Sequence, residues 1–262
     1  MTILTHELKQ NRISFWVWTA SIAFMLLICM LMYPEIESGM KAVTNLFASM
    51  GSFTAAFGMD RLNFGEVMGF YGIECGNILS LGGGLFSALL GITALSKEEK
   101  DRTAEFLLSH PIRRSTVVLQ KLGAVLVQVL MLNLIVMGAS LAAFGMIGES
   151  PAVKEFLLLH GAYTVLQAEI SCVCFGISAF LQGNGMGIGM GLTILLYFFN
   201  LIKNISDKAD LLKYVTPFAY AEPADLISEA LIDGRLMGLG ILYSVICVGV
   251  GFVKYVKKDI TA

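Results

Sequence analysis

Long apolar stretches alternate with shorter polar segments along the whole chain. Because an α-helix rises 1.5 Å per residue, about 20 apolar residues cross the roughly 30 Å hydrocarbon core of a bilayer. The pattern predicts an all-α integral membrane protein in which residues 1–262 form a single polytopic transmembrane domain. Six transmembrane helices are predicted, at residues 14–33, 76–95, 117–147, 156–181, 186–202 and 236–253.

Two amphipathic segments flank these spans. Residues 2–13 place Ile3, Leu4 and Leu8 among polar neighbours, a pattern that fits an N-terminal interfacial helix or equally a frayed charged flank. Acidic residues recur every fourth position in 225–233, opposite leucine, isoleucine and alanine, which predicts a short helix lying on the membrane.

The composition supports a membrane protein. Hydrophobic residues make up 56% of the chain and charged residues 15%, whereas soluble domains carry roughly 25% charged residues. The formal net charge of -2 and the absence of a basic patch argue against a nucleic-acid partner. Membrane lipids are therefore the expected surroundings.

Basic residues predict the orientation, because cytoplasmic loops carry an excess of lysine and arginine. With both termini in the cytoplasm, the short cytoplasmic segments hold Lys9, Arg12, Lys97, Lys100, Arg102, Arg113, Arg114, Lys121, Lys254, Lys257 and Lys258. The remaining basic residues are spread over longer external loops rich in aspartate and glutamate. The loop between the fourth and fifth spans, 182–185, carries no charge and leaves that junction undetermined.

Neither the cysteines nor the glycine run indicates a metal or phosphate site. Cys172 and Cys174 are too close for a zinc pair on one helix face, so no metal site is expected. The run 183–191 matches no register of a dinucleotide-binding fingerprint and begins an apolar span. Gly183, Gly187 and Gly191 are instead spaced by four, which predicts close packing against another membrane helix.

Three polar side chains in the fourth span are candidate functional residues. Glu169 lies near the middle of the span, where a charged carboxylate costs roughly 2.5–3.5 kcal/mol. His160 and Gln167 share a polar stripe on another side of the helix. These residues either line a translocation path or form structural hydrogen bonds within the bundle; the structural interpretation is slightly favoured.

A charged insert, residues 96–114, separates the second and third predicted spans. Ser96 and Glu99 have the spacing of a capping box, so a helix is expected to begin there. Pro111 cannot continue it. The insert is thus predicted to contain a cytosolic helix of about three turns, with an apolar edge made by Phe106 and Leu107.

The insert resembles the first cytoplasmic loop of ATP-binding-cassette (ABC) export permeases of the type-2 family. It reads as an acidic cluster, Thr, an acidic residue, Leu-Leu-Ser, His-Pro, Ile-Arg and then Lys121, although Arg102 stands where that family commonly has glycine. The resemblance implies an ATPase-coupling role for Glu98, Glu99, Thr103, Glu105, Phe106, Leu107, Leu108, Pro111 and Arg113.

The same resemblance implies partners and a location. A permease of this kind works with two ABC ATPase subunits and a second permease, identical or homologous, in the plasma membrane of a bacterial cell. No Gly-Lys dipeptide occurs to build a Walker A loop. ATP and Mg are therefore expected on the partner ATPase, with no cofactor bound and no catalytic residue in this chain.

Two other classes remain as alternatives. A secondary transporter or channel would be expected to show an inverted repeat or broken helices with paired charges, and no convincing repeat is present. An intramembrane enzyme is a more distant alternative. Glu98, Glu99 and Arg102 superficially resemble a prenyl-protease motif, but the spacing is one residue short and the intramembrane histidines are missing.

Overall fold

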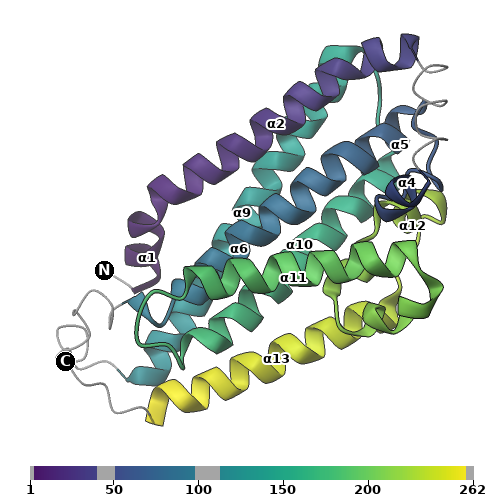
Figure 1. The fold of residues 1–262 in the computed structure, drawn as a ribbon. Helices are drawn as coiled ribbons and strands as arrows, with labels where there is room; N and C mark the ends of the chain where they lie inside the picture. The colour runs from purple at the N-terminus through teal and green to yellow at the C-terminus, as the bar shows by residue number, and fades with distance from the viewer. Residues whose placement is uncertain (1–2, 40–50, 98–112, 258–262) are drawn as a thin grey trace.

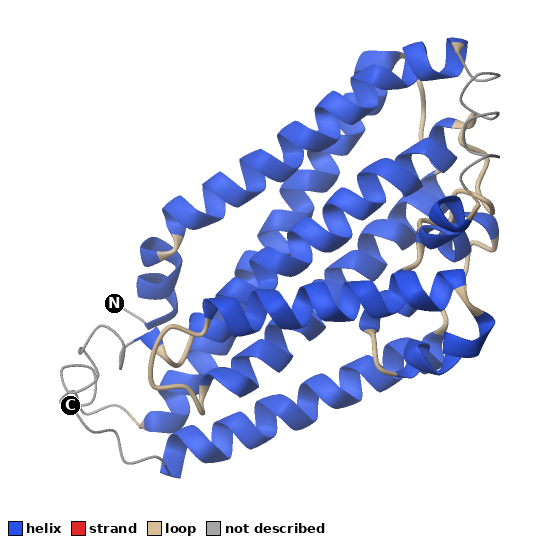
Figure 2. Ribbon diagram, in the orientation of Figure 1, coloured by secondary structure: helices blue, strands red, loops and turns tan. Residues whose placement is uncertain are grey.

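A computed structural model describes residues 3–39, 51–97 and 113–257 of the chain. The described residues form helices and turns and contain no strand (Figure 2). Six helical segments are long and apolar enough to cross a membrane, so the predicted all-α fold with six spans is confirmed. They are α2 (Arg12–Ser38), Val67–Thr93, α9 (Arg114–Ile147), α10 (Val153–Ser178), α11 (Met186–Ile205) and α13 (Gly234–Lys257).

The second span is assembled from four consecutive pieces. These are α5 (Val67–Phe70), two π-helical turns η1 (Tyr71–Cys75) and η2 (Ile78–Gly82), and α6 (Gly83–Thr93). It begins earlier than the apolar stretch at 76–95 because residues 67–75, which include Glu74 and two glycines, are packed inside the protein. Wide π-turns release backbone carbonyls from the regular ladder, so neighbouring side chains must satisfy them.

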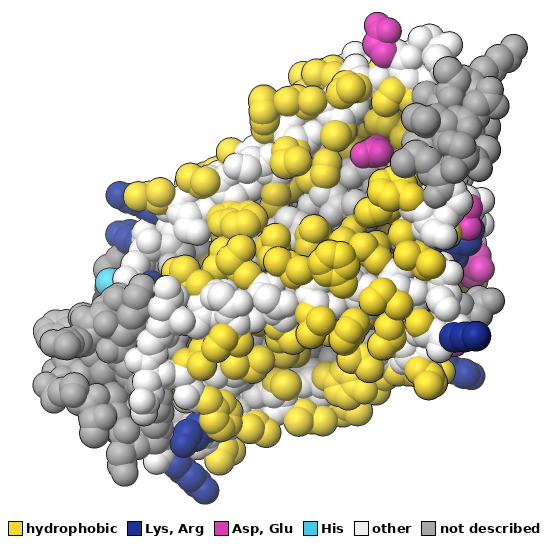
Figure 3. Space-filling view, viewed as in Figure 1, with side chains coloured by type: hydrophobic (Ala, Val, Ile, Leu, Met, Phe, Trp, Pro, Cys, Tyr) yellow, Lys and Arg dark blue, Asp and Glu magenta, His cyan; other side chains and the backbone are white. Residues whose placement is uncertain are grey.

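α10 lies at the centre of the bundle. It packs against α6, α9 and α13, while α2 packs on α9 and α11 on α6 (Figure 1). The second span is the most buried of the six and α13 the least. The outer faces of α2, α11 and α13 therefore present apolar side chains to the surroundings, as the yellow surface in Figure 3 shows. This belt is the surface that a bilayer or another membrane helix would cover.

The bundle has two chemically different ends. The short helix α1 (Ile3–Gln10) lies at one end, the α1 end, together with Lys97, Arg113 and Lys257, the last residue of α13 (Figure 1). The opposite α12 end carries short helices that connect the spans. These are α4 (Ser52–Ala56), η3 (Asp207–Tyr214), η4 (Pro217–Ala221) and α12 (Pro223–Ser228).

The helix predicted at 225–233 differs from the helix observed. α12 begins at Pro223 and ends at Ser228, and Ala230 has a positive φ of 50°, so the chain leaves the helical conformation there. Pro223 lies in the first turn, where its missing N–H breaks no helical hydrogen bond. The four-residue spacing of Asp225, Glu229 and Asp233 predicted a helix that begins later. That prediction did not take into account Pro223, which favours a helix start two residues earlier.

Candidate functional site

Most of the predicted coupling residues lie outside the described residues. These are Glu98, Glu99, Thr103, Glu105, Phe106, Leu107, Leu108 and Pro111. Arg113 is described: it is exposed and immediately precedes α9 with an extended backbone. Lys97 is described on the other side of the insert, after α6. The structure therefore shows what surrounds the two flanks of the insert.

A buried ion cluster, the Glu7 cluster, includes Lys97 at one flank and Lys121 of α9, eight residues after Arg113 at the other flank. Glu7 of α1 is 5% exposed and Lys121 of α9 is 1% exposed. The Lys121 ammonium donates to Glu7 Oε1 at 2.8 Å and to the Ala94 carbonyl oxygen at 2.8 Å. Lys97 lies 3.7 Å from Glu7 Oε2. Such charges remain buried only when each is paired and hydrogen-bonded.

The Glu7 cluster joins three elements at the α1 end. α1 supplies the carboxylate, α9 supplies Lys121, and the end of the second span supplies Lys97 and the Ala94 carbonyl. The Leu4 backbone N–H also donates to Gln120 Oε1 at 3.3 Å. Residues 3–10 are thus a docked helix rather than a frayed flank.

Gln167 satisfies a carbonyl of the π-helical region. Its Nε2 donates to the Leu79 carbonyl oxygen at 3.1 Å, and its Oε1 accepts from Asn133 Nδ2 at 2.7 Å. Gly83 leaves the space for this amide, because a Cβ there would overlap the Gln167 side chain. Gln167 of α10 therefore forms structural hydrogen bonds to η2 and α9.

His160 belongs to a second buried network. The Tyr71 hydroxyl donates to Ser140 Oγ at 2.8 Å and lies 2.8 Å from His160 Nε2. The His160 ring also packs against Phe156 in a tilted arrangement, with centroids 4.5 Å apart. This network joins η1, α9 and α10 inside the bundle, so His160 packs in the core near the α12 end.

Glu169 differs from both because neither carboxylate oxygen has a standard hydrogen bond within the described residues. The residue is 4% exposed. Its carboxyl packs on Gly240 of α13, where a Cβ would overlap Oε2. The Tyr220 hydroxyl lies near enough to interact electrostatically but forms no hydrogen bond of standard geometry with Glu169. A buried polar group left in this state is costly, which makes Glu169 a candidate for ligand contact.

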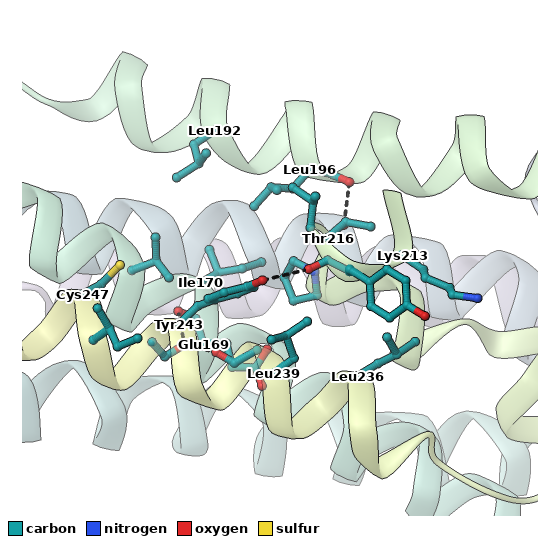
Figure 4. Close-up of a pocket in the computed structure, with 17 residues that line it drawn as sticks. Glu169, Ile170, Leu192, Leu196, Lys213, Thr216, Leu236, Leu239, Tyr243 and Cys247 are labelled. Carbon is teal, nitrogen blue, oxygen red and sulfur yellow. Dashed lines mark hydrogen bonds between the residues drawn. The ribbon is translucent and has the colours of Figure 1, made fainter. Parts of the chain in front are cut away.

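A cavity of about 270 Å³ lies beside Glu169, between α10, α11, α13 and the turns η3 and η4 (Figure 4). Its walls are mainly aliphatic. The lining includes Ile170, Val173, Leu192, Leu196, Leu236, Leu239 and Ile246. Lys213 lines the side at η3, where a hydrogen bond to the Asp210 carboxylate raises the pKa of the lysine. A second hollow on the other side of α13 also includes Glu169 and Ser244.

Gly183, Gly187 and Gly191 meet no other atom within 4 Å of an added Cβ. Their predicted packing would therefore require a neighbouring molecule, and it stays a prediction. Within the chain, Gly185 and Gly189 approach Ile92 of α6 instead. α10 and α13 also approach each other closely: a Cβ on Gly176 would overlap the Cys247 carbonyl, and one on Gly251 would lie 2.7 Å from Gly176 Cα.

Sequence reasoning missed Glu7, Asn133 and Gly176 as partners of these sites. Glu7 stands in a polar flank, Asn133 is a single amide in a long apolar span, and Gly176 belongs to no spaced glycine pattern. Each acquires its role only from a residue distant in the chain. Among the described residues, no group of three histidine, cysteine, aspartate or glutamate side chains is arranged to hold a metal ion.

The family model described as ABC-2 family transporter protein matches residues 1–260. No curated protein gives a significant match. The family match covers the six membrane-spanning helices and both flanks of the charged insert. The resemblance seen in that insert is thus confirmed at the level of the family: the chain belongs to the ABC-2 family of transporter proteins.

Proposed function

We propose that this chain is the transmembrane permease subunit of an ATP-driven exporter. It forms the translocation path, and separate ATPase subunits, which bind ATP and Mg, hydrolyse the nucleotide. The observation that carries the proposal is the match of residues 1–260 to the ABC-2 family. Supporting it, the insert that resembles a coupling loop joins two spans at the end of the bundle where α1 is held by Glu7 and Lys121.

The charge distribution supports an α1 end in the cytoplasm of a bacterial plasma membrane. Basic side chains predominate at the α1 end, whereas the α12 end carries most of the acidic ones (Figure 3). The described basic residues at the α1 end are Lys9, Arg12, Lys97, Arg113, Arg114, Lys254 and Lys257. This is the asymmetry of the positive-inside rule, and it favours cytoplasmic termini.

Thiol labelling in intact cells tests this orientation. In a variant without the native cysteines, we expect Asp60→Cys to react with a membrane-impermeant maleimide added outside, because Asp60 is exposed at the α12 end. Lys100→Cys should react only after the cells are opened. Labelling of Lys100→Cys from outside would reverse the proposed orientation.

A second permease would pack on α11. Gly187, Gly191, Leu195, Phe198 and Ile202 recur at helical spacing, and the two glycines meet nothing within the chain. Leu195 and Phe198 are 49% and 54% exposed. Small residues beside exposed apolar ones are typical of close helix association in membranes. We therefore place the contact with a second copy, or a homologous permease, on this face.

Coupling would be mechanical. An ATPase that pulls on the insert displaces its flanks, Lys97 and Arg113, and the Glu7 cluster conveys that displacement to α1 and α9. The apolar edge of the insert, Phe106 and Leu107, supplies the predicted docking surface for the ATPase, with the surrounding charges at its rim.

Substitution of Phe106 tests the coupling role. A buried aromatic anchor at an interface commonly contributes about 2 kcal/mol or more, and rim charges contribute less. We expect Phe106→Ala to release the ATPase from the tagged chain, or to separate ATP hydrolysis from transport. The matched variant Lys100→Ala should keep both. ATPase activity captured with the chain, the mass of the purified complex and transport in membrane vesicles are the measurements.

Membrane insertion of both variants serves as the control. If Phe106→Ala retains a tightly bound ATPase and full transport, the coupling role of the insert is wrong. A mass that corresponds to two permeases and two ATPases would support the proposed assembly, and a single permease would contradict the role of α11.

A further inference from the structure

We propose that the cavity beside Glu169 binds a small lipophilic amine, whose protonated nitrogen is held by the Glu169 carboxylate and whose hydrocarbon part fills the aliphatic walls. This proposal rests on the proposed permease function in one respect: if the chain is a permease, the bound amine is a candidate for the transported substrate. Binding itself needs no ATPase, so the two proposals can fail separately.

The Glu169 carboxyl group is buried without a regular hydrogen-bond partner. Glu169 is 4% exposed, and neither oxygen has a hydrogen-bond partner of standard geometry among the described residues. By contrast, the buried carboxylate of Glu222, at the α12 end, accepts from Asn200 at 2.8 Å and Asn204 at 3.0 Å, and Glu7 accepts from Lys121. Of these three carboxyl groups, Glu169 alone lacks a hydrogen bond of standard geometry, although the Tyr220 hydroxyl lies near it, so its oxygens can accept a donor from a ligand.

The Glu169 carboxyl lies directly against the backbone of α13. Gly240 lacks the Cβ that would overlap Glu169 Oε2, so α13 passes directly over the side chain (Figure 4). Glu169 borders the hollows on both sides of α13. Since Gly240 lies six residues after Gly234, where α13 begins, the carboxyl lies only about 9 Å below that helix end. The same cavity is also lined by Lys213 and Thr216, so it extends from Glu169 toward η3 and η4.

The cavity is lined mainly by apolar side chains, with Glu169 on one side and Lys213 at η3. Thr216, Tyr243 and Ser244 add hydroxyl groups to this lining. Lys213 is paired with Asp210, so its charge is compensated locally. A volume of about 270 Å³ lies near the lower end of ordinary ligand pockets, roughly 300–1,000 Å³. The space fits one short hydrocarbon chain or ring and excludes a lipid with two acyl chains.

These features of the cavity indicate the chemical class of its ligand. A neutral hydrocarbon would fill the walls but leave the carboxyl unpaired, and an anion would be repelled by it. An ammonium group supplies both the charge and the hydrogen-bond donors that a carboxylate accepts. Apolar contacts and one charge-assisted hydrogen bond together describe a lipophilic amine.

Binding of hexylamine to the purified protein in detergent micelles tests the proposal, with hexanol as the neutral probe of equal chain length. We expect hexylamine to raise the thermal unfolding temperature of the wild type more than hexanol does, because a ligand that binds only the folded state stabilises it. In Glu169→Gln the dissociation constant for hexylamine should increase roughly 10- to 100-fold, as loss of a hydrogen bond to a charged group implies.

Two further variants keep the test decisive. Glu155→Gln removes a carboxylate from the first turn of the same helix, outside the cavity lining, and should leave hexylamine binding unchanged. Leu239→Trp fills the cavity while retaining Glu169, and should also prevent hexylamine binding. If Glu169→Gln does not fold, this variant still tests whether hexylamine binds in the cavity. Equal binding of hexylamine to wild type and Glu169→Gln, or equal stabilisation by hexylamine and hexanol, would overturn the proposal.

Discussion

Replacing Lys121 by methionine should destabilise the purified protein by about 3–5 kcal/mol, because it removes one partner of a buried ion pair and leaves Glu7 without its closest cation. The Lys121 ammonium donates at 2.8 Å to both Glu7 and the Ala94 carbonyl, so two buried acceptors lose a donor. Methionine preserves the length and much of the volume of the side chain. Unfolding by SDS in mixed micelles is the measurement.

The chain offers matched controls for this experiment. Lys257→Met removes an exposed lysine at the same end and should change the stability by no more than about 0.5 kcal/mol. The double variant Glu7→Leu/Lys121→Met should be more stable than Lys121→Met alone, since no unpaired carboxylate remains buried. A Lys121→Met protein as stable as the Lys257→Met protein would show that the pair contributes little.

The role of Lys121 illustrates what the sequence could and could not predict. Lys121 belongs to the string that resembles a coupling loop, so its importance was visible in the sequence. Its partner Glu7 lies 114 positions away. The sequence pattern around Glu7 fitted an interfacial helix and a frayed flank equally well. Long-range pairing of this kind depends on how the spans pack, and local periodicity does not encode it.

Hydropathy predicted the six spans because the energy of a membrane segment depends mainly on local composition. The packing surfaces were harder to predict. The regular spacing of Gly187 and Gly191 indicated close packing, yet these positions meet nothing within the chain. Gly176 and Gly240 have no regular spacing, and they make the close approaches between α10 and α13. The spacing of glycines shows which face of a helix carries small residues, but it does not show which other helix packs against that face.

Glu169 was expected to face the bundle interior, a partner or a wet cavity. The structure places it inside the bundle, beside a cavity and against α13. Its distinction from Gln167 was not predictable. Both are polar residues in one apolar span, but Gln167 meets Asn133 and the Leu79 carbonyl, whereas Glu169 meets a glycine. The difference comes from the widened second span and from the course of α13.

The second large effect is expected at the contact between α10 and α13. In Gly176→Ala, the new Cβ would overlap the Cys247 carbonyl, which is backbone and cannot move aside as a side-chain end could. Gly251 approaches the same point, so both helices would have to separate. We expect a loss of about 1–3 kcal/mol or more in the free energy of unfolding, the usual range for added methyl groups in a well-packed interior.

Gly161→Ala is the matched control, because Gly161 lies in the same helix and meets no atom within 4 Å. Alanine favours helix over glycine by up to about 1 kcal/mol in water, so this variant should be unchanged or slightly more stable. Opposite effects of one substitution at two positions of α10 would assign the cost to helix contact rather than to propensity. If Gly176→Ala is instead as stable as Gly161→Ala, α10 and α13 have room to separate, and the course of α13 over Glu169 is not fixed by this contact.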